Sequence, residues 1–377
     1  METPFVYGKV AKSNEFTNRI KDVTYLTNNF KGLINTIIVS PRRWGKTSLV
    51  NKVAEQFESD NNYFVCKIDV FNCRTRDQFY SAFANSVLKA SVTDWEGFAA
   101  GVKKYLSALL PKIALSDSVQ SYELSFGVDF NEKSLTIDEI LDLPYKIALE
   151  KNRKFIVCID EFQNVSDYED FIGFQQALRA HWQQHDNVCY CLFGSKRHML
   201  LKIFNEYNMP FYKFGDILFL EKISTVDWIK FISGRFTDTN KEISDELSSE
   251  IAKKVNNHPY YVQQLSQQVW LRTEKNVTEE TVSESFESLI NQLSLLFTNL
   301  IDSMTIKQIN FLIAIAKGEK NFSSKQVLSN YNLGTSANIK NLKNFALDKD
   351  LIDIKGDLIE FQDPMFEYWI LNNYLKN

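Results

Sequence analysis

The feature that most restricts the fold lies between residues 34 and 57, where an apolar run, a polar loop and a helical pattern follow one another. The apolar run covers 34–39, the loop at 40–48 reads Ser-Pro-Arg-Arg-Trp-Gly-Lys-Thr-Ser, and the helical pattern covers 49–57. A strand that leads into a helix at Gly-Lys-Thr presents backbone N–H groups and the positive end of the helix dipole to a phosphate. This order of elements predicts an α/β fold built around a phosphate-binding loop.

The loop residues have distinct expected roles. Lys46 is expected to reach the β- and γ-phosphates of a nucleotide, and the Thr47 hydroxyl to hold Mg²⁺. The first Gly of the G-x-x-x-x-G-K-[ST] pattern is Ser40 here, and Ser lacks the freedom of Gly at positive φ. A chance Gly-Lys-Thr at a helix start is the alternative, against which the flanking strand and helix argue. The candidate nucleotide-binding residues of the loop are Pro41, Arg42, Arg43, Trp44, Gly45, Lys46, Thr47 and Ser48.

A second motif is the predicted strand 154–159, whose apolar residues 155–159 are followed by Asp160 and Glu161, a Walker B pattern. A buried parallel strand carries such acids to the sheet edge where the phosphate loop lies. Asp160 is therefore predicted to join Thr47 around Mg²⁺, and Glu161 to orient or deprotonate the attacking water. The alternative is a buried strand that merely ends in acids.

The next apolar run, 188–193, is followed by Ser195, which is the candidate sensor of the γ-phosphate. The alternative is that Ser195 only caps the helix that follows. Arg179, Arg197 and Lys213 are candidates for an arginine finger; for each of them an exposed, solvated side chain is the alternative, and the usual one for surface Arg and Lys.

The sequence pattern divides the chain into three parts. Residues 1–223 hold the predicted strands and the phosphate loop, with an inserted helix and hairpin at 91–135. Residues 224–303 are helical throughout and are predicted to form a lid. Residues 304–377 predict three helices and a two-stranded wing, the order of a winged helix-turn-helix.

Charge limits the partners. The 377-residue chain has a net charge of −4, so nothing draws it as a whole towards nucleic acid or an anionic membrane. Residues 303–377 contain nine Lys, no Arg and eight acidic residues, which leaves no guanidinium fork for reading guanine. Lys340 and Lys343 are nevertheless placed to meet phosphate, so DNA binding through 324–361 stays open. A module that docks a protein partner or a second copy of the chain is the alternative.

Cysteine usage and hydropathy point to a cytoplasmic protein without a membrane span. The five cysteines show no C-x-x-C spacing, and most lie in apolar runs, where Cys behaves as a small hydrophobe. No apolar run approaches the roughly 18 residues that a membrane helix needs. His181 and His185 have the spacing of a zinc pair but lack the H-E-x-x-H base and a third ligand, so we expect them on a solvated helix face.

Together these motifs resemble the prokaryotic archaeal-type ATPase domain family, P-loop proteins of the STAND group within the AAA-like branch. The resemblance implies a five-stranded parallel core of order 5-1-4-3-2, a helical lid and a C-terminal winged helix. It also implies that Asn18, Arg19 and Pro259 approach the base and sugar of the nucleotide. The matching stretches extend over nearly the whole chain: 16–19, 41–48, 159–163, 193–196, 258–261 and 361–366.

The expected function is that of an ATP-binding, slowly hydrolysing switch that uses ATP and Mg²⁺ and couples them to the lid and the winged helix. Two alternatives stay open. In one, the chain is a DNA-binding regulator whose ATPase controls the winged helix. In the other, it is a scaffold that keeps its nucleotide for structure and docks a protein partner.

Overall fold

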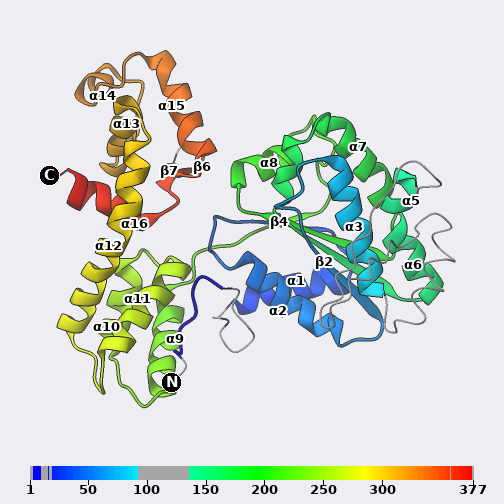
Figure 1. Cartoon of the computed structure of the whole chain (residues 1–377), viewed down its shortest axis with the longest axis horizontal. Coiled ribbons are helices and arrows are strands. Elements are labelled where there is room, and N and C mark those ends of the chain that lie inside the picture. Colours follow the sequence, from blue (N-terminus) through cyan, green and yellow to red (C-terminus); the bar gives the residue numbers. More distant parts are fainter. Residues whose placement is uncertain (1–2, 10–15, 17–18, 92–135, 357, 376–377) are drawn as a thin grey trace, which may run out of the picture.

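The computed structural model describes residues 3–9, 16, 19–91, 136–356 and 358–375. Asn18 and, apart from its first residue, the predicted insertion at 91–135 lie outside them. Figure 1 shows two lobes, one built on a sheet with helices on both faces and one made of helices that carry a small two-stranded wing.

A parallel sheet organises the first lobe, with strands in the order β2-β3-β4-β1-β5. This is the predicted order 5-1-4-3-2 read from the other edge, so the predicted α/β core is confirmed. Strands β1 and β4 are buried at every position, as expected for parallel strands covered on both faces. The five strands are β1 (Thr36–Val39), β2 (Tyr63–Asp69), β3 (Lys154–Asp160), β4 (Val188–Gly194) and β5 (Asp216–Phe219).

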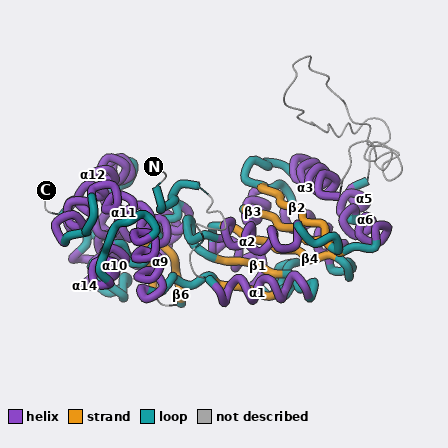
Figure 2. Tube along the Cα trace, turned by 90° about the horizontal axis from the view of Figure 1, so that it is seen from below, coloured by secondary structure: helices purple, strands orange, loops and turns teal. Residues whose placement is uncertain are grey.

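Two apolar layers cover the sheet, because successive strand residues point to opposite faces. Ile38 packs into one layer with α1 (Ile20–Lys31) and α2 (Lys46–Glu58), and Ile37 packs into the other. In Figure 2, α1 lies below the strands and α3 lies above them. The second layer contains α3 (Arg76–Ser91), α5 (Ile137–Leu141), α6 (Leu143–Lys151), α7 (Phe171–Trp182), α8 (Arg197–Asn205) and the 3₁₀-helix Phe162–Asp167.

The second lobe begins with the predicted lid helices and ends with the winged helix. The lid comprises α9 (Thr225–Thr237), α10 (Asp245–Lys254), α11 (Pro259–Arg272) and α12 (Glu279–Asp302). On α15 (Ser336–Asp348), Ile339 and Leu342 are buried and Phe345 is partly buried, so these residues form the core-facing side of this helix. The winged helix comprises α13 (Ile306–Ala316), α14 (Lys325–Asn330), α15 (Ser336–Asp348), the antiparallel strands β6 (Ile352–Lys355) and β7 (Leu358–Phe361), α16 (Pro364–Trp369) and a π turn at Ile370–Tyr374.

The lid and the winged helix share one apolar core, which runs without a break from α9 to Ile370. Helix α12 contributes Leu289 and Phe297 to it. Phe5 of the N-terminal segment inserts into the same core, with its ring 5.6 Å from that of Phe236. The two modules therefore form a single body, and the predicted division at 303/304 falls at the end of α12, inside this core.

The five cysteines are buried and unpaired. Over the residues that the structure describes, no helix is both long and apolar enough to cross a bilayer.

The pair His181 and His185 departs from the prediction of a solvated face. His185 is buried under the stacked ring of Tyr145, and its Nδ1 lies 2.8 Å from the Tyr190 hydroxyl. Both histidines contact Asp142, at 2.8 Å and 3.2 Å. They join α5 and α6 to α7 and β4, because the carboxylate satisfies ring nitrogens that packing removes from water.

Candidate nucleotide-binding site

The phosphate loop between β1 and α2 turns through two residues of positive φ, Arg43 at 62° and Gly45 at 86°. Gly45 is the N-cap of α2, and only Gly takes this conformation without steric cost. Ser40 does not have positive φ; it is buried, and its hydroxyl donates to the Pro41 carbonyl at 3.2 Å. Ser in place of the first motif Gly therefore fits the backbone without left-handed strain.

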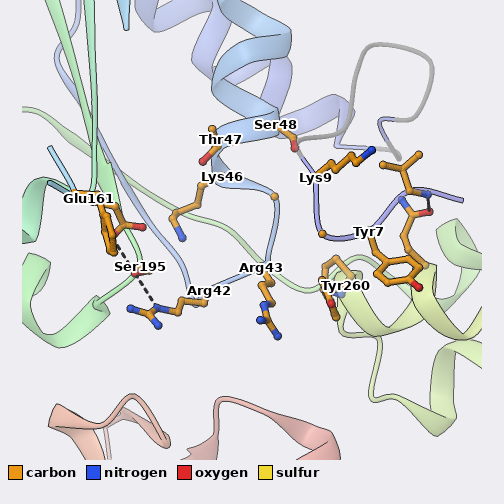
Figure 3. Close-up of a pocket in the computed structure, with 16 residues that line it drawn as sticks. Tyr7, Lys9, Arg42, Arg43, Lys46, Thr47, Ser48, Glu161, Ser195 and Tyr260 are labelled. Atoms are coloured by element: carbon orange, nitrogen blue, oxygen red, sulfur yellow. Dashed lines mark hydrogen bonds between the residues drawn. The ribbon is translucent and has the colours of Figure 1, made fainter. Parts of the chain in front are cut away.

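A cavity of about 700 Å³ opens over this loop, within the size range of small-ligand sites. Its lining combines the loop and the first turn of α2, the carboxyl ends of sheet strands, the start of α11 and the N-terminal segment. Lys9, Arg42, Arg43 and Lys46 bring positive charge to this lining, and Glu161 brings negative charge (Figure 3). The balance favours an anionic ligand.

Lys46 extends from the first turn of α2 into the cavity (Figure 3). Its Nζ donates to the carbonyls of Ser40 at 3.4 Å and Pro41 at 3.2 Å. Burial lowers the pKa of Lys46 to about 8, against the opposing pull of the Glu161 and Asp160 carboxylates. An ammonium group in such a poorly solvated place interacts more strongly with phosphate than one in bulk water.

Thr47 and Asp160 meet across the end of the sheet, where the Thr47 hydroxyl donates to Asp160 Oδ2 at 2.8 Å. Burial raises the pKa of Asp160 to about 6, and the hydrogen bond from Thr47 opposes that rise. Hydroxyl and carboxylate oxygens are hard donors of the kind that Mg²⁺ prefers. The pair therefore fits the ion that the sequence predicts here.

Glu161 follows β3 in a left-handed conformation, with φ 53°. Its Oε2 accepts hydrogen bonds from the Ser195 hydroxyl at 3.0 Å and from the Gln163 amide. Arg42 Nε donates in turn to Ser195 Oγ at 3.4 Å, so a chain of contacts links the loop to the acid (Figure 3). The N-cap of α8 is Lys196, and no side chain caps it, so Ser195 does not serve as the helix cap of the alternative reading.

The lid supplies the opposite side of the cavity. Pro259 is the first residue of α11, a position where its fixed φ suits the helix. The Arg43 guanidinium lies 4.5 Å from the ring centroid of Tyr260, and Tyr7 meets the same ring edge-on at 5.6 Å. Figure 3 shows these aromatic rings across the cavity from Lys46. Flat apolar rings of this kind suit a nucleotide base.

Comparison with known proteins agrees with the fold described above. The family model described as a probable winged helix domain matches residues 295–372. A Walker-type ATPase of Pyrococcus abyssi is similar over 97% of this chain and 99% of its own, with TM-score 0.67 and 15% identity. The chain has the fold of P-loop ATPases that end in a winged helix. Two Aeropyrum pernix structures share this fold. ORC2, solved as ADPNP–ADP complexes, has TM-score 0.59 and 12% identity over 99% of this chain and 100% of its own. ORC1, solved in complex with DNA, has TM-score 0.51 and 11% identity over 99% of this chain and 98% of its own. No curated protein matches the sequence.

Three predicted nucleotide-binding residues of this ATPase fold, Arg19, Pro41 and Trp44, lie outside the lining of the cavity. Arg19 is buried and donates to the carbonyls of Trp44 at 2.9 Å and Glu221 at 3.1 Å, so it braces the loop from behind. Trp44 packs edge-on against His258 of the lid. Pro41 and Trp44 border a separate cavity of about 290 Å³ at the junction with the winged helix. These side chains shape the loop, and their contact with a nucleotide stays a prediction.

The arginine-finger candidates of the sequence also lie away from the cavity lining. Arg179 donates to two carbonyls of the loop before β5, at 3.2 Å and 3.0 Å. Arg197 pairs with Asp353 of β6 at 3.4 Å, and the Lys213 ammonium lies 5.3 Å from the Tyr212 ring. Arg42, which the sequence identified only as a loop residue, is the arginine that reaches the candidate sensor Ser195.

Proposed function

We propose that this chain binds ATP, hydrolyses it slowly and acts as a nucleotide-dependent switch for its lid and winged helix. The observation that carries the proposal is the contact of Thr47 with Asp160 at 2.8 Å, beside Lys46 and Glu161 at one end of the cavity. In an ATPase these side chains bind phosphate, hold the metal ion and prepare the water, and they have to lie together.

The residues divide the chemistry between them. Lys46 and the backbone N–H groups of the loop bind the phosphates, and Thr47 and Asp160 would hold Mg²⁺. Bound Mg²⁺ neutralises charge on the phosphate oxygens. Glu161 orients the attacking water or accepts its proton, and Ser195, hydrogen-bonded to Glu161, is the group that contacts the γ-phosphate.

The lid side of the cavity and the family resemblance of the motifs support ATP as the ligand and a switch as the function. Tyr260 and Pro259 offer an apolar surface for the base at the start of the lid. A nucleotide that spans the loop and the lid would order the two against each other. The resemblance to archaeal-type ATPases of the STAND group favours slow turnover, and the Aeropyrum pernix ORC2 structure of the same fold is described with ADPNP and ADP.

Two substitutions test this proposal in purified protein. Lys46→Ala should lose ATP binding, because Lys46 is the residue assigned to the β- and γ-phosphates at the start of α2. Glu161→Gln should bind ATP and hydrolyse it about 10²–10⁴-fold more slowly, since the amide does not accept the proton. Lys52→Ala on α2 and Glu169→Gln after the 3₁₀-helix make the same chemical changes away from the cavity and should match the parent. Equal turnover by Glu161→Gln and the parent would remove Glu161 as the base.

A DNA-binding regulator is the second candidate, favoured by the winged helix and by the exposed Lys340 on α15. The Aeropyrum pernix ORC1 structure of the same fold is described with DNA. If the chain has this function, its affinity for DNA should fall steeply as the salt concentration rises, and the double variant Lys340→Ala/Lys343→Ala should bind DNA more weakly than the parent. Failure to bind DNA at low salt would eliminate it. Protein purified with stoichiometric ADP and no turnover would instead favour a scaffold that docks a protein partner.

A further inference from the structure

Arg42 of the phosphate loop lies between two groups that belong to different lobes. Its Nε donates to Ser195 Oγ at 3.4 Å, on the sheet side of the cavity. Its terminal nitrogen lies 3.5 Å from Asp350 Oδ2, in the turn between α15 and β6 of the winged helix. In Figure 3 the ribbon of the C-terminal region passes beneath the cavity on the side of Arg42 and Arg43. One guanidinium therefore contacts both the candidate sensor and the winged helix.

The winged-helix end of this contact is rigid. Asp350 has φ 55°, and its turn is fixed by backbone hydrogen bonds from Asp350 to Leu347 and from Leu351 to Ala346, both 2.9 Å. The Asp350 side chain is 12% exposed, whereas that of Arg42 is 57% exposed. Oδ1 of Asp350 is buried and accepts no hydrogen bond from the described residues.

This burial makes the Asp350 carboxylate depend on its cation. Burial raises the pKa of Asp350, and Arg42 is the first of the positive groups that oppose the rise, ahead of Lys196 and His198. If Arg42 moves away, a half-buried carboxylate is left without its main partner, which is unfavourable. The position of Arg42 and the docking of the winged helix are therefore coupled.

A second ion pair joins the same segment of the winged helix to the core. Arg197, at the start of α8, pairs with Asp353 of β6 at 3.4 Å. Neither residue lines the nucleotide cavity. This pair supplies an internal control, because it holds the same interface and also involves an aspartate but does not involve the phosphate loop.

Resting on the ATPase function proposed above, we infer that Arg42 is the residue through which the winged helix reads the terminal phosphate of ATP. Asp350 and the γ-phosphate compete for its guanidinium. A phosphate carries more charge than a carboxylate and accepts two parallel hydrogen bonds from arginine, so ATP draws Arg42 off Asp350, and ADP, without the γ-phosphate, leaves the pair in place. By linkage, Asp350 weakens ATP binding by the same factor by which ATP loosens the winged helix.

The variant Asp350→Asn tests this inference. Asn keeps the shape of the side chain and tolerates the left-handed turn, so the fold should survive. Removing a partly exposed ion pair should tighten ATP binding about two- to fivefold and leave ADP binding unchanged. Asp353→Asn should not change the ratio of ATP to ADP affinity. In the Arg42→Ala background, Asp350→Asn should have no effect on either nucleotide.

Hydrogen exchange provides a readout that does not depend on turnover. In the parent, ATP but not ADP should speed backbone exchange in residues 348–355. In Asp350→Asn the same residues should exchange fast without nucleotide.

The outcomes separate this inference from the ATPase proposal. If the parent binds ATP and Asp350→Asn changes ATP and ADP affinity equally, the effect is general charge repulsion and the inference is wrong while the ATPase remains. The same holds if Asp353→Asn reproduces the change, or if it persists without Arg42. A parent that binds neither nucleotide would overturn both proposals.

Discussion

His258 joins the phosphate loop to the lid, and its ionisation should control how firmly the two are held together. Its ring packs edge-on against Trp44 at 6.5 Å and lies 5.0 Å from the ring of Tyr261. Burial, together with the positive charges of Arg43 and Lys222, lowers the pKa of His258 from 6.5 to about 3. Its Nδ1 is buried and has no hydrogen-bond partner among the described residues. The folded protein therefore requires the neutral imidazole.

The direction and size of the pH effect follow from the two pKa values. A group with a lowered pKa in the folded state contributes stability that is present above the unfolded pKa and is lost as pH falls towards the folded one. For His258 the window runs from about pH 6.5 down to about 3. Between pH 7 and pH 5 this one proton should lower the free energy of unfolding by about 2 kcal/mol.

The substitution His258→Asn isolates this contribution. Asn does not titrate and keeps a polar group near the position of Nδ1. Urea unfolding of parent and variant at several pH values between 7 and 5 gives two curves of stability against pH. Carboxylates titrate in both proteins, so the difference between the curves reports His258 alone. The curves should converge by about 2 kcal/mol as pH falls to 5. Parallel curves would refute the reasoning, because they would mean that His258 gains its proton as easily in the folded chain as in the unfolded one.

Two further substitutions test contacts around the cavity and inside the second lobe. Gly194→Ala should lower kcat for ATP about ten- to a hundredfold with little change in nucleotide affinity, because the new methyl group would displace the Gln163 amide that holds Glu161. Steady-state kinetics that show an equal loss of affinity would contradict this. Tyr261→Phe should lower the free energy of unfolding by about 1–3 kcal/mol, since the hydroxyl of the buried Tyr261 donates at 2.6 Å to the partly buried carboxylate of Asp363. Urea unfolding curves that superimpose on those of the parent would show that water replaces the bond.

The sheet and the paired motifs were predictable because their signals are local. The residues directly before Ser40 and Asp160, 37–39 and 155–159, are all apolar, as buried parallel strands require, and they lie in β1 and β3. Parallel strands present their carboxyl ends at one edge, so a topological rule was enough to bring Asp160 to the loop, where it meets Thr47. The helix predicted at 336–348 coincides with α15, because its apolar spacing repeats over several turns.

Contacts between distant segments carried no such signal. Arg42 reaches Ser195 across 153 residues, and Arg19 reaches Glu221 across 202, so neither spacing nor composition reveals them. Tyr7 precedes every predicted element, and only the fold brings it to the cavity. Tyr260 was within reach of sequence reasoning, since it follows Pro259 in the His-Pro-Tyr-Tyr motif.

Buried polar groups were the other point of failure. We expected His185 to lie with His181 on a solvated helix face. In the structure, Tyr145 and Tyr190, which belong to other elements, pack against it. A sequence shows which residues share a helix face, but it does not show what packs on that face. The same limit hid the dependence of Asp350 on Arg42, because half of that contact lies in the phosphate loop.

Two interfaces of the winged helix, one with the lid and one with the sheet lobe, differ in how much apolar contact they contain. This difference indicates which of them a bound nucleotide could open. Lid and winged helix share one apolar core, and the hydrogen bond from Tyr261 to the partly buried Asp363 also joins them. Separating them would therefore expose apolar surface and break this hydrogen bond. The winged helix contacts the sheet lobe through the ion pairs Arg42–Asp350 and Arg197–Asp353. The Arg42 side of the first pair is exposed, and partly exposed pairs of that kind contribute only about 0.2–1 kcal/mol. Binding of a phosphate supplies enough free energy to break contacts of that size. We therefore expect the switch proposed above to move the lid and the winged helix as one body relative to the sheet lobe, without separating them from each other.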